Sequence, residues 1–190
     1  MNKIISNYEY YTNSPSDINE HLPTLKKYAD ECDHVTEMGV RFVVSTWALL
    51  AGKPKRMVAI DIMQRPVGEA ARLAEEAGIE FAFQIGDTAD ENFEIEETDL
   101  LFIDTWHIYE QLKREFELHA KKARKYIVLH DTTKYGDIGE EHTYEDALVK
   151  VGEQRKGLWA AIEEFVQDNP EWYIKERFVN NNGLTVLAKK

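Results

Sequence analysis

Cysteine is almost absent from this sequence. The single cysteine, Cys32, excludes an intrachain disulfide and a zinc site built from several cysteines. Long hydrophobic runs are missing too, because no segment approaches the roughly 18 apolar residues that span a membrane. Residues 1–9 lack the apolar core of a signal peptide. These absences predict a cytoplasmic protein.

Positive charge is also in short supply. The chain has 23 Lys and Arg against 35 Asp and Glu, a formal net charge of −12. Such a balance disfavours nucleic acids and anionic membranes as partners and leaves a small molecule as the expected one. The 190 residues contain no repeat and no Gly/Ser/Pro-rich linker, so we expect residues 1–190 to form a single domain.

Short apolar runs alternate with segments of helical periodicity along the chain. The apolar runs cover residues 34–39, 56–62, 79–86, 100–105 and 125–129, and the helical segments cover residues 45–50, 66–78 and 109–123. This alternation is typical of a mostly parallel sheet with crossover helices. We therefore expect an α/β fold with a doubly wound, Rossmann-like sheet.

The C-terminal part of the pattern changes from parallel to antiparallel. A helix is expected from residue 158 and stops before Pro170. Strand-like runs follow at residues 172–179 and 184–188, and the Asn-Gly pair between them is a strong hairpin signal. The complete prediction is a sheet of seven strands that ends in an antiparallel hairpin.

Two further segments lie outside the alternation. Residues 1–30 are expected to be helical, with residues 14–17 as the N-cap of a helix whose apolar positions begin at Ile18. Residues 132–157 are polar, acidic and poor in strand signals. Because so long an irregular segment is usually functional, we expect an active-site loop or lid there.

Polar or acidic residues follow each of the first five predicted strands. In open α/β sheets, ligands bind beyond the carboxyl ends of the strands, where the strand order reverses. Any one strand can stop at polar residues, but five such ends favour a ligand site. The five ends are Glu37-Met38-Gly39, Asp61, Gly86-Asp87-Thr88, Asp104-Thr105-Trp106-His107 and His130-Asp131-Thr132.

The spacing of Gly39 and Asp61 is typical of a nucleoside site. Asp61 lies 22 residues after Gly39, the separation at which an acidic residue receives the ribose hydroxyls in a Rossmann-type unit. A carboxylate accepts two hydroxyl donors at once, and a glycine lets the backbone approach the ligand closely. The structural alternative is that Asp61 caps the helix that follows it.

A second group of residues combines carboxylates with imidazoles. Asp104 and His107 follow the fourth predicted strand, and His130 and Asp131 follow the fifth. Since neighbouring strands end side by side, these four residues can hold a divalent cation such as Mg²⁺ or Mn²⁺. His107 can instead serve as a general base. For either histidine alone, a surface or capping role is the common alternative.

The residues after the first predicted strand carry a family resemblance. Glu37-Met38-Gly39-Val40-Arg41, followed by Ser45-Thr46-Trp47-Ala48, is similar to the first motif of the cephalosporin-hydroxylase-like and macrolide-sugar O-methyltransferase group. These are class I S-adenosylmethionine-dependent methyltransferases, and the predicted order of elements resembles their fold over nearly the whole chain. Phe42-Val43-Val44 replace the glycines of the family, which implies a differently shaped loop.

The resemblance implies a cofactor, a divalent cation and roles for individual residues. S-adenosylmethionine would place its methionine ammonium at Glu37, its ribose at Asp61 and its adenine amino group at Asp87. The acceptor would be a small hydroxylated molecule, preferably a sugar or glycan-derived diol. The implied residues are Glu37, Gly39, Ser45, Asp61, Asp87 and Thr88 for the cofactor, Asp104, His130 and Asp131 for the metal, and His107 as the base.

Three other functions are compatible with parts of the sequence. A metal-dependent hydrolase could use the same Asp and His residues to activate water, as HD phosphohydrolases do from helices. An NAD-dependent oxidoreductase would also use Asp61 to bind ribose hydroxyls, but it normally needs the motif Gly-x-Gly-x-x-Gly, which is absent after Gly39. A silent binding domain would keep the fold without turnover. The sequence leaves the oligomeric state open, a homo-oligomer included.

Overall fold

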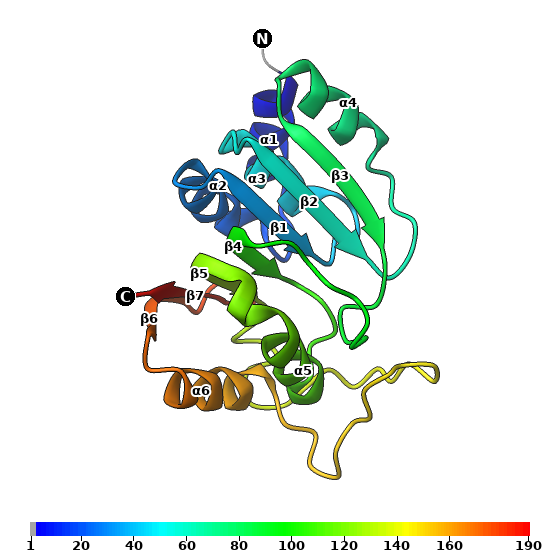
Figure 1. The fold of residues 1–190 in the computed structure, drawn as a ribbon, viewed down its shortest axis with the longest axis vertical. Coiled ribbons are helices and arrows are strands. Elements are labelled where there is room, and N and C mark those ends of the chain that lie inside the picture. Colours follow the sequence, from blue (N-terminus) through cyan, green and yellow to red (C-terminus); the bar gives the residue numbers. More distant parts are fainter. Residues whose placement is uncertain (1–2) are drawn as a thin grey trace.

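A seven-stranded sheet forms the centre of the computed structural model, which describes residues 3–190 (Figure 1). The strand order is β3-β2-β1-β4-β5-β7-β6. The first five strands are parallel, and β7 runs antiparallel between β5 and β6, so the predicted fold class and hairpin are confirmed. The strands are β1 (His34–Met38), β2 (Arg56–Asp61), β3 (Glu80–Ile85), β4 (Thr98–Ile103), β5 (Ala123–His130), β6 (Trp172–Phe178) and β7 (Leu184–Lys189).

Helices cover both faces of the sheet and bury a separate core on each. On one face, α1 to α4 pack over residues such as Val35 and Leu100; on the other, α5 and α6 pack over residues such as Leu101 and Ile127. Full burial of β4 explains its apolar run, Leu100 to Ile103, whereas β1 is equally buried although it carries Thr36 and Glu37. The helices are α1 (Lys3–Asn13), α2 (Leu22–Asp30), α3 (Val44–Ala51), α4 (Gly68–Glu76), α5 (Tyr109–His119) and α6 (Leu158–Asp168).

The N-terminal segment differs from its prediction in where the helices begin. It contains two α-helices, and α2 starts at Leu22 after a short 3₁₀ turn, not at Ile18. The reason is Pro23, which is tolerated in the first turn of a helix but not in its interior. The helix α1, which lies ahead of residues 14–17, packs against α3.

The helix predicted over residues 109–123 is also shorter than expected. The α-helical part ends at His119, a 3₁₀ turn covers Ala120–Lys122, and Ala123 already pairs with Thr98 as the first residue of β5. Ala120 and Ala123 are buried, so they continued the apolar periodicity past the true end of the helix. The apolar stripe therefore predicted correctly that Ala120 and Ala123 are buried, but it assigned them to the wrong secondary-structure element.

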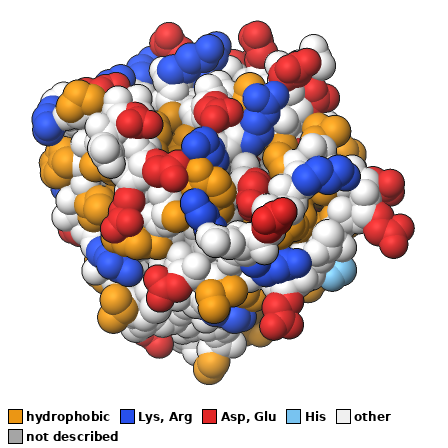
Figure 2. All heavy atoms as spheres, turned by 90° about the horizontal axis from the view of Figure 1, so that it is seen from below, with side chains coloured by type: hydrophobic (Ala, Val, Ile, Leu, Met, Phe, Trp, Pro, Cys, Tyr) orange, Lys and Arg blue, Asp and Glu red, His pale blue; other side chains and the backbone are white. Residues whose placement is uncertain are grey.

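Residues 132–157 form neither helix nor strand and contain one isolated bridge, between Ile138 and Lys156. They lie near α5 and α6, on the side of the molecule shown from below in Figure 2. Acidic and basic side chains are interspersed on this face, so its described residues offer no extended basic surface for phosphates (Figure 2). None of the helices within residues 3–190 is long and apolar enough to cross a membrane.

Candidate functional site

The site is built where β1, β4 and β5 end side by side. The order of the strands along the chain reverses between β1 and β4, which is where open α/β sheets bind ligands. The Asp104 amide donates to the Met38 carbonyl oxygen at 2.8 Å, so the loop after β4 continues the sheet beside β1. Asp131 follows β5 directly and has a left-handed backbone (φ +59°). These contacts bring the residues predicted from two strand ends together.

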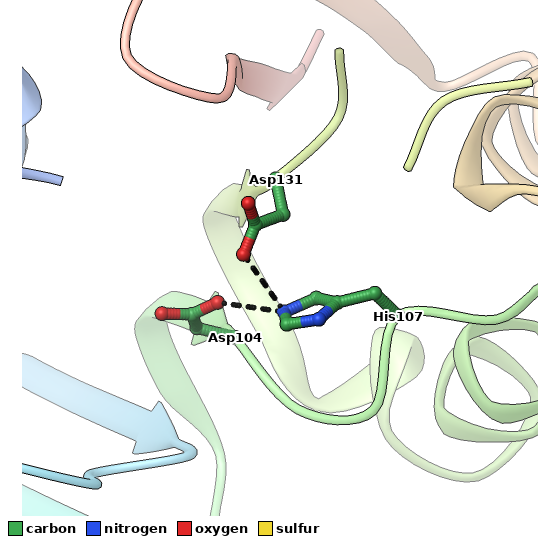
Figure 3. Close-up of side chains that lie close together, drawn as sticks. All are labelled: Asp104, His107 and Asp131. Atoms are coloured by element: carbon green, nitrogen blue, oxygen red, sulfur yellow. Dashed lines mark hydrogen bonds and ion pairs between the residues drawn. The ribbon is translucent and has the colours of Figure 1, made fainter. Parts of the chain in front are cut away.

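Four atoms that could bind a metal ion, two imidazole nitrogens and two carboxylate oxygens, form a closed ring here. We call it the donor ring. His107 Nε2 lies 3.2 Å from Asp104 Oδ1 and 3.0 Å from Asp131 Oδ2 (Figure 3). His130 Nδ1 lies 3.4 Å from each of the same two oxygens. Three of the four side chains, those of Asp104, His107 and Asp131, offer ligand atoms within 4.8 Å of one another. The predicted group of two carboxylates and two imidazoles therefore exists as one cluster.

The outer nitrogen of each imidazole is held by an oxygen atom. His107 Nδ1 lies 3.0 Å from Glu140 Oε2, and His130 Nε2 lies 3.1 Å from the Asp17 carbonyl oxygen. A carbonyl oxygen only accepts, so His130 Nε2 carries a proton and its Nδ1 faces the ring. That Nδ1 is buried and has no hydrogen-bond partner among residues 3–190, and neither has Asp131 Oδ1. Such orphaned buried atoms call for a further partner in the ring.

Charge within the cluster shifts every pKa toward the ionised form. Burial alone would lower the pKa of His107, but hydrogen bonds to Asp104, Asp131 and Glu140 raise it well above 6.5. Burial would also lower the pKa of His130, but the negative charges of Asp104 and Asp131 raise it to about 10. Burial likewise opposes ionisation of Asp104, yet the two imidazoles lower its pKa to about 2.

Asp61 anchors the loop that follows β1. Its Oδ2 accepts hydrogen bonds from the amides of Val40 and Arg41 at 3.0 and 3.1 Å and lies 2.8 Å from Arg65 Nε. Its Oδ1 accepts only from the Met63 amide, at 3.2 Å, among the described residues. Since a carboxylate has about four acceptor positions, Oδ1 keeps room for one hydroxyl donor. The sequence predicted contacts to both ribose hydroxyls.

The loop itself alternates between ordinary and left-handed backbone. Gly39, Arg41 and Val43 have φ values of +88°, +45° and +65°. A left-handed conformation costs a non-glycine residue about 1–2 kcal/mol, and it is a true outlier for a β-branched one. The loop therefore has a positive-φ backbone at two residues that are not glycine, Arg41 and Val43. Strain of this kind collects at functional sites.

Glu37 lies beneath this loop and is fully buried. Its two carboxylate oxygens accept hydrogen bonds from Ser45 Oγ at 2.5 Å and Thr46 Oγ1 at 2.7 Å, both in α3. Burial raises the pKa of Glu37 to about 7, and the two hydroxyls limit the rise. Two of the predicted cofactor residues, Glu37 and Ser45, are therefore hydrogen-bonded to each other. A contact between Glu37 and a cofactor ammonium stays a prediction.

Asp87 and Thr88 follow β3 and connect to α5. Asp87 Oδ1 accepts from the Ala89 amide at 2.8 Å, which is a local turn contact. Thr88 Oγ1 donates to Glu115, a buried carboxylate that also receives Thr105 Oγ1 at 2.9 Å. Glu115 thus ties the loop after β3 to the loop after β4. It was not predicted from the sequence, because a lone Glu on a helix gives no signal.

Replacing Glu115 with Gln is expected to flatten the pH dependence of stability. Burial raises the pKa of Glu115 from 4.5 to about 7, so the folded protein holds a proton that the unfolded chain releases. Its contribution is present below pH 4.5 and is lost as the pH rises through 7, about 3 kcal/mol in all.

Urea unfolding between pH 4.5 and 7.5 measures this contribution. Glu115→Gln should lose less stability than the wild-type protein over that range, and Glu117→Gln, an exposed change on the same helix, should match the wild-type protein. Parallel curves for the wild-type protein and Glu115→Gln would refute the assignment.

No protein-family model matches the sequence, and no curated protein is similar to it. Solved structures are similar in fold. An O-methyltransferase from Bacillus cereus in complex with SAH has a TM-score of 0.64 at 17% identity, covering 99% of this chain and 89% of that one.

Two further structures extend the similarity. The O-methyltransferase TomG from Streptomyces achromogenes, in complex with SAM, has a TM-score of 0.62 at 15% identity and covers 99% of this chain and 88% of its own. The N-methyltransferase NodS from Bradyrhizobium japonicum has a TM-score of 0.61 at 16% identity and covers 91% and 96%. The chain therefore has the fold of class I methyltransferases, which serves acceptors of more than one kind.

Proposed function

We propose that this protein is an S-adenosylmethionine-dependent O-methyltransferase that acts on a small hydroxylated acceptor with the help of a divalent cation. The loop after β1 carries the proposal, because three alternate residues keep positive φ there although two of them are not glycine. The donor ring after β4 and β5 lies at the same edge of the sheet. A nucleoside site beside a metal site suits transfer from a bound cofactor.

The residues at the ends of β1, β2 and β3 fit an adenosine group. Asp61 Oδ1 offers one open acceptor for a ribose hydroxyl. Large apolar side chains are exposed around it, which suits the faces of a purine ring. These side chains, with their exposed fractions, are Phe42 (66%), Ile62 (61%), Met63 (54%) and Ile85 (56%). S-adenosylmethionine, when bound, supplies a methyl group activated by its sulfonium.

The donor ring fits a cation, which would be held by Asp104, Asp131 and His130. A bound cation supplies Lewis acidity that lowers the pKa of a hydroxyl group. Methyl transfer forms an oxygen–carbon bond and breaks the sulfur–carbon bond, whose electron pair stays on sulfur, while the hydroxyl proton leaves. The task of the side chains is to hold the two reactants in line.

His107 was predicted as the base that takes this proton. In the structure both of its nitrogens are engaged, Nδ1 by Glu140 and Nε2 by Asp104 and Asp131. A substrate hydroxyl would have to displace a carboxylate to reach Nε2. These contacts favour a role for His107 within the cluster and release of the proton to water.

We further propose a sugar or glycan-derived diol as the acceptor, covered by residues 132–157. Two neighbouring hydroxyls can bind one cation together. Aromatic groups of the loop lie close by, with the rings of Trp106 and Tyr144 5.2 Å apart and Trp106 Nε1 donating to the His142 carbonyl oxygen at 3.1 Å. Tyr144 is half exposed and offers a face to an incoming ring.

A metal-dependent hydrolase is the second candidate, because the donor ring alone could hold an ion that activates water. A hydrolase has no use for the strained loop after β1 or for the exposed apolar groups beside Asp61. Dependence on S-adenosylmethionine separates the two functions.

Calorimetric titration with S-adenosylhomocysteine tests the proposal. We expect the wild-type protein to bind it at micromolar concentration, about −8 kcal/mol, and Asp61→Asn to bind at least about tenfold more weakly. Asp33→Ala is the control, because Asp33 is exposed and lies just before the start of β1, far from the strand ends that form the site. Absence of binding to the wild-type protein with and without Mn²⁺, or equal affinity of Asp61→Asn, would contradict the proposed site.

A further inference from the structure

The long loop holds His107 from two sides. The ring of Tyr135 stacks on the His107 ring with the centroids 4.8 Å apart and the planes 5° from parallel. Glu140 Oε2 lies 3.0 Å from His107 Nδ1, and the Glu140 amide donates to the His107 carbonyl oxygen at 2.9 Å. Both residues belong to the segment 132–157. The orientation of His107 is therefore set by this loop and not by the sheet alone.

The backbone around Glu140 is itself fixed. The Gly139 amide donates to the Arg155 carbonyl oxygen at 3.2 Å, and the Arg155 guanidinium donates to the Glu140 carbonyl oxygen. A side chain at Gly139 would crowd the carbonyl oxygens of Lys156 and His107. Residues 139–140 and 155–156 thus meet beside His107, and the contacts between them hold the Glu140 backbone in place.

The contact with Glu140 decides which nitrogen of His107 faces the two aspartates. A carboxylate only accepts, so Nδ1 donates to Glu140 and Nε2 points at Asp104 and Asp131. His130 has the mirror arrangement, with Nε2 donating to carbonyl oxygens, while its buried Nδ1 faces the same two carboxylates and has no hydrogen-bond partner within residues 3–190. Both imidazoles are thus oriented as metal-bound histidines are, with the outer nitrogen held by an oxygen.

The nitrogen–oxygen spacing along the sides of the ring also suits neighbouring ligands of one ion. Their nitrogen–oxygen separations are 3.0, 3.2, 3.4 and 3.4 Å around the ring. Ligands about 2.1 Å from a common ion lie ~3.0 Å apart in octahedral geometry and ~3.4 Å apart in tetrahedral geometry. The sides of the ring therefore match neighbouring ligands of one ion, and the ligand atoms of Asp104, His107 and Asp131 all lie within 4.8 Å of one another.

We propose that His107 is a fourth metal ligand and that Glu140 is the positioning residue that makes it one, so that metal binding is coupled to docking of the 132–157 loop. This inference rests on the metal centre of the proposed function. Two nitrogens and two carboxylate oxygens favour Mn²⁺, Fe²⁺ or Zn²⁺ over Mg²⁺, which prefers oxygen ligands. Undocking of the loop releases His107 and weakens the site.

Titration of the purified protein with Mn²⁺ alone tests the coupling. We expect Glu140→Ala to weaken Mn²⁺ binding by about 10–100-fold, the usual effect of losing the partner of a ligating histidine. Glu140→Gln should stay near the wild-type affinity, because the amide oxygen still accepts from Nδ1. Glu141→Ala, an exposed neighbour in the same loop, should leave the affinity unchanged. Wild-type Mg²⁺ affinity should be much lower than that for Mn²⁺.

Pulsed electron paramagnetic resonance of the Mn²⁺-loaded protein gives a second readout. We expect nitrogen couplings from two imidazoles in the wild-type protein and from one in His107→Ala. Equal Mn²⁺ affinity of Glu140→Ala and the wild-type protein, or a signal from one imidazole in the wild-type protein, would overturn the inference. Absence of Mn²⁺ binding would overturn it together with the metal role, whereas S-adenosylhomocysteine binding without metal tests the methyltransferase separately.

Discussion

Replacing Gly39 with Ala is expected to destabilise the protein by roughly 3 to 5 kcal/mol. Two effects add at this position. The backbone is left-handed, with φ +88°, and a Cβ would overlap the carbonyl group of Asp104. The backbone of Asp104 cannot withdraw easily, because its amide is bonded to Met38. The substitution therefore pushes β1 and β4 apart at the site.

Two other glycines separate these effects. Gly78 has φ +75°, but no atom lies within 4 Å of the place that a Cβ would take, so Gly78→Ala should cost only about 1 kcal/mol of backbone strain. Gly68 has neither feature, and Gly68→Ala should be neutral or slightly stabilising. Urea unfolding of the three variants measures the free energies of unfolding. A loss for Gly39→Ala no larger than that for Gly78→Ala would show that the close approach to Asp104 is absent.

Removing the carboxylate of Asp131 is expected to weaken Mn²⁺ binding by at least about 100-fold. Its Oδ2 makes two of the four nitrogen–oxygen contacts of the donor ring, one with His107 and one with His130. The loss also removes a negative charge that attracts the cation. Asp104→Ala should have a similar effect, because Asp104 Oδ1 makes the other two nitrogen–oxygen contacts.

The specificity of that loss can be measured with two titrations. Asp137→Ala, an exposed change in the same loop, is the control and should keep full Mn²⁺ affinity. S-adenosylhomocysteine should bind Asp131→Ala as it binds the wild-type protein, because the proposed adenosine site lies at the ends of β1 to β3. Unchanged Mn²⁺ affinity of Asp131→Ala would exclude the ring as the metal site.

Most of the fold follows from patterns that the sequence displays directly. Buried parallel strands such as β2 and β4 contain apolar runs of four residues in the sequence, and the Asn-Gly turn specified the final hairpin. The ends of elements were harder to predict. At Ala120 and Ala123 the apolar spacing of a helix continues through a 3₁₀ turn into a strand, so periodicity alone could not locate the boundary.

The candidate site was predictable only where it depends on strand order. Asp104 and Asp131 were expected together because strands four and five were expected to be neighbours. Glu140 could not be found in this way, because it lies in an irregular loop and reaches His107 through a fold of the chain that has no periodic signal. For Asp61 the spacing predicted its place beside the loop, but not that backbone amides and Arg65 would occupy most of its oxygens.

Binding of S-adenosylmethionine and a divalent cation at one edge of the sheet is central to the proposed function. A crystal structure of the protein with S-adenosylhomocysteine and MnCl₂, with anomalous diffraction recorded for manganese, tests it most directly. We predict a manganese peak about 2.1 Å from the inner atoms of Asp104, His107, His130 and Asp131, and the nucleoside beside Asp61. Crystals grown with both ligands that show neither at this edge would contradict it.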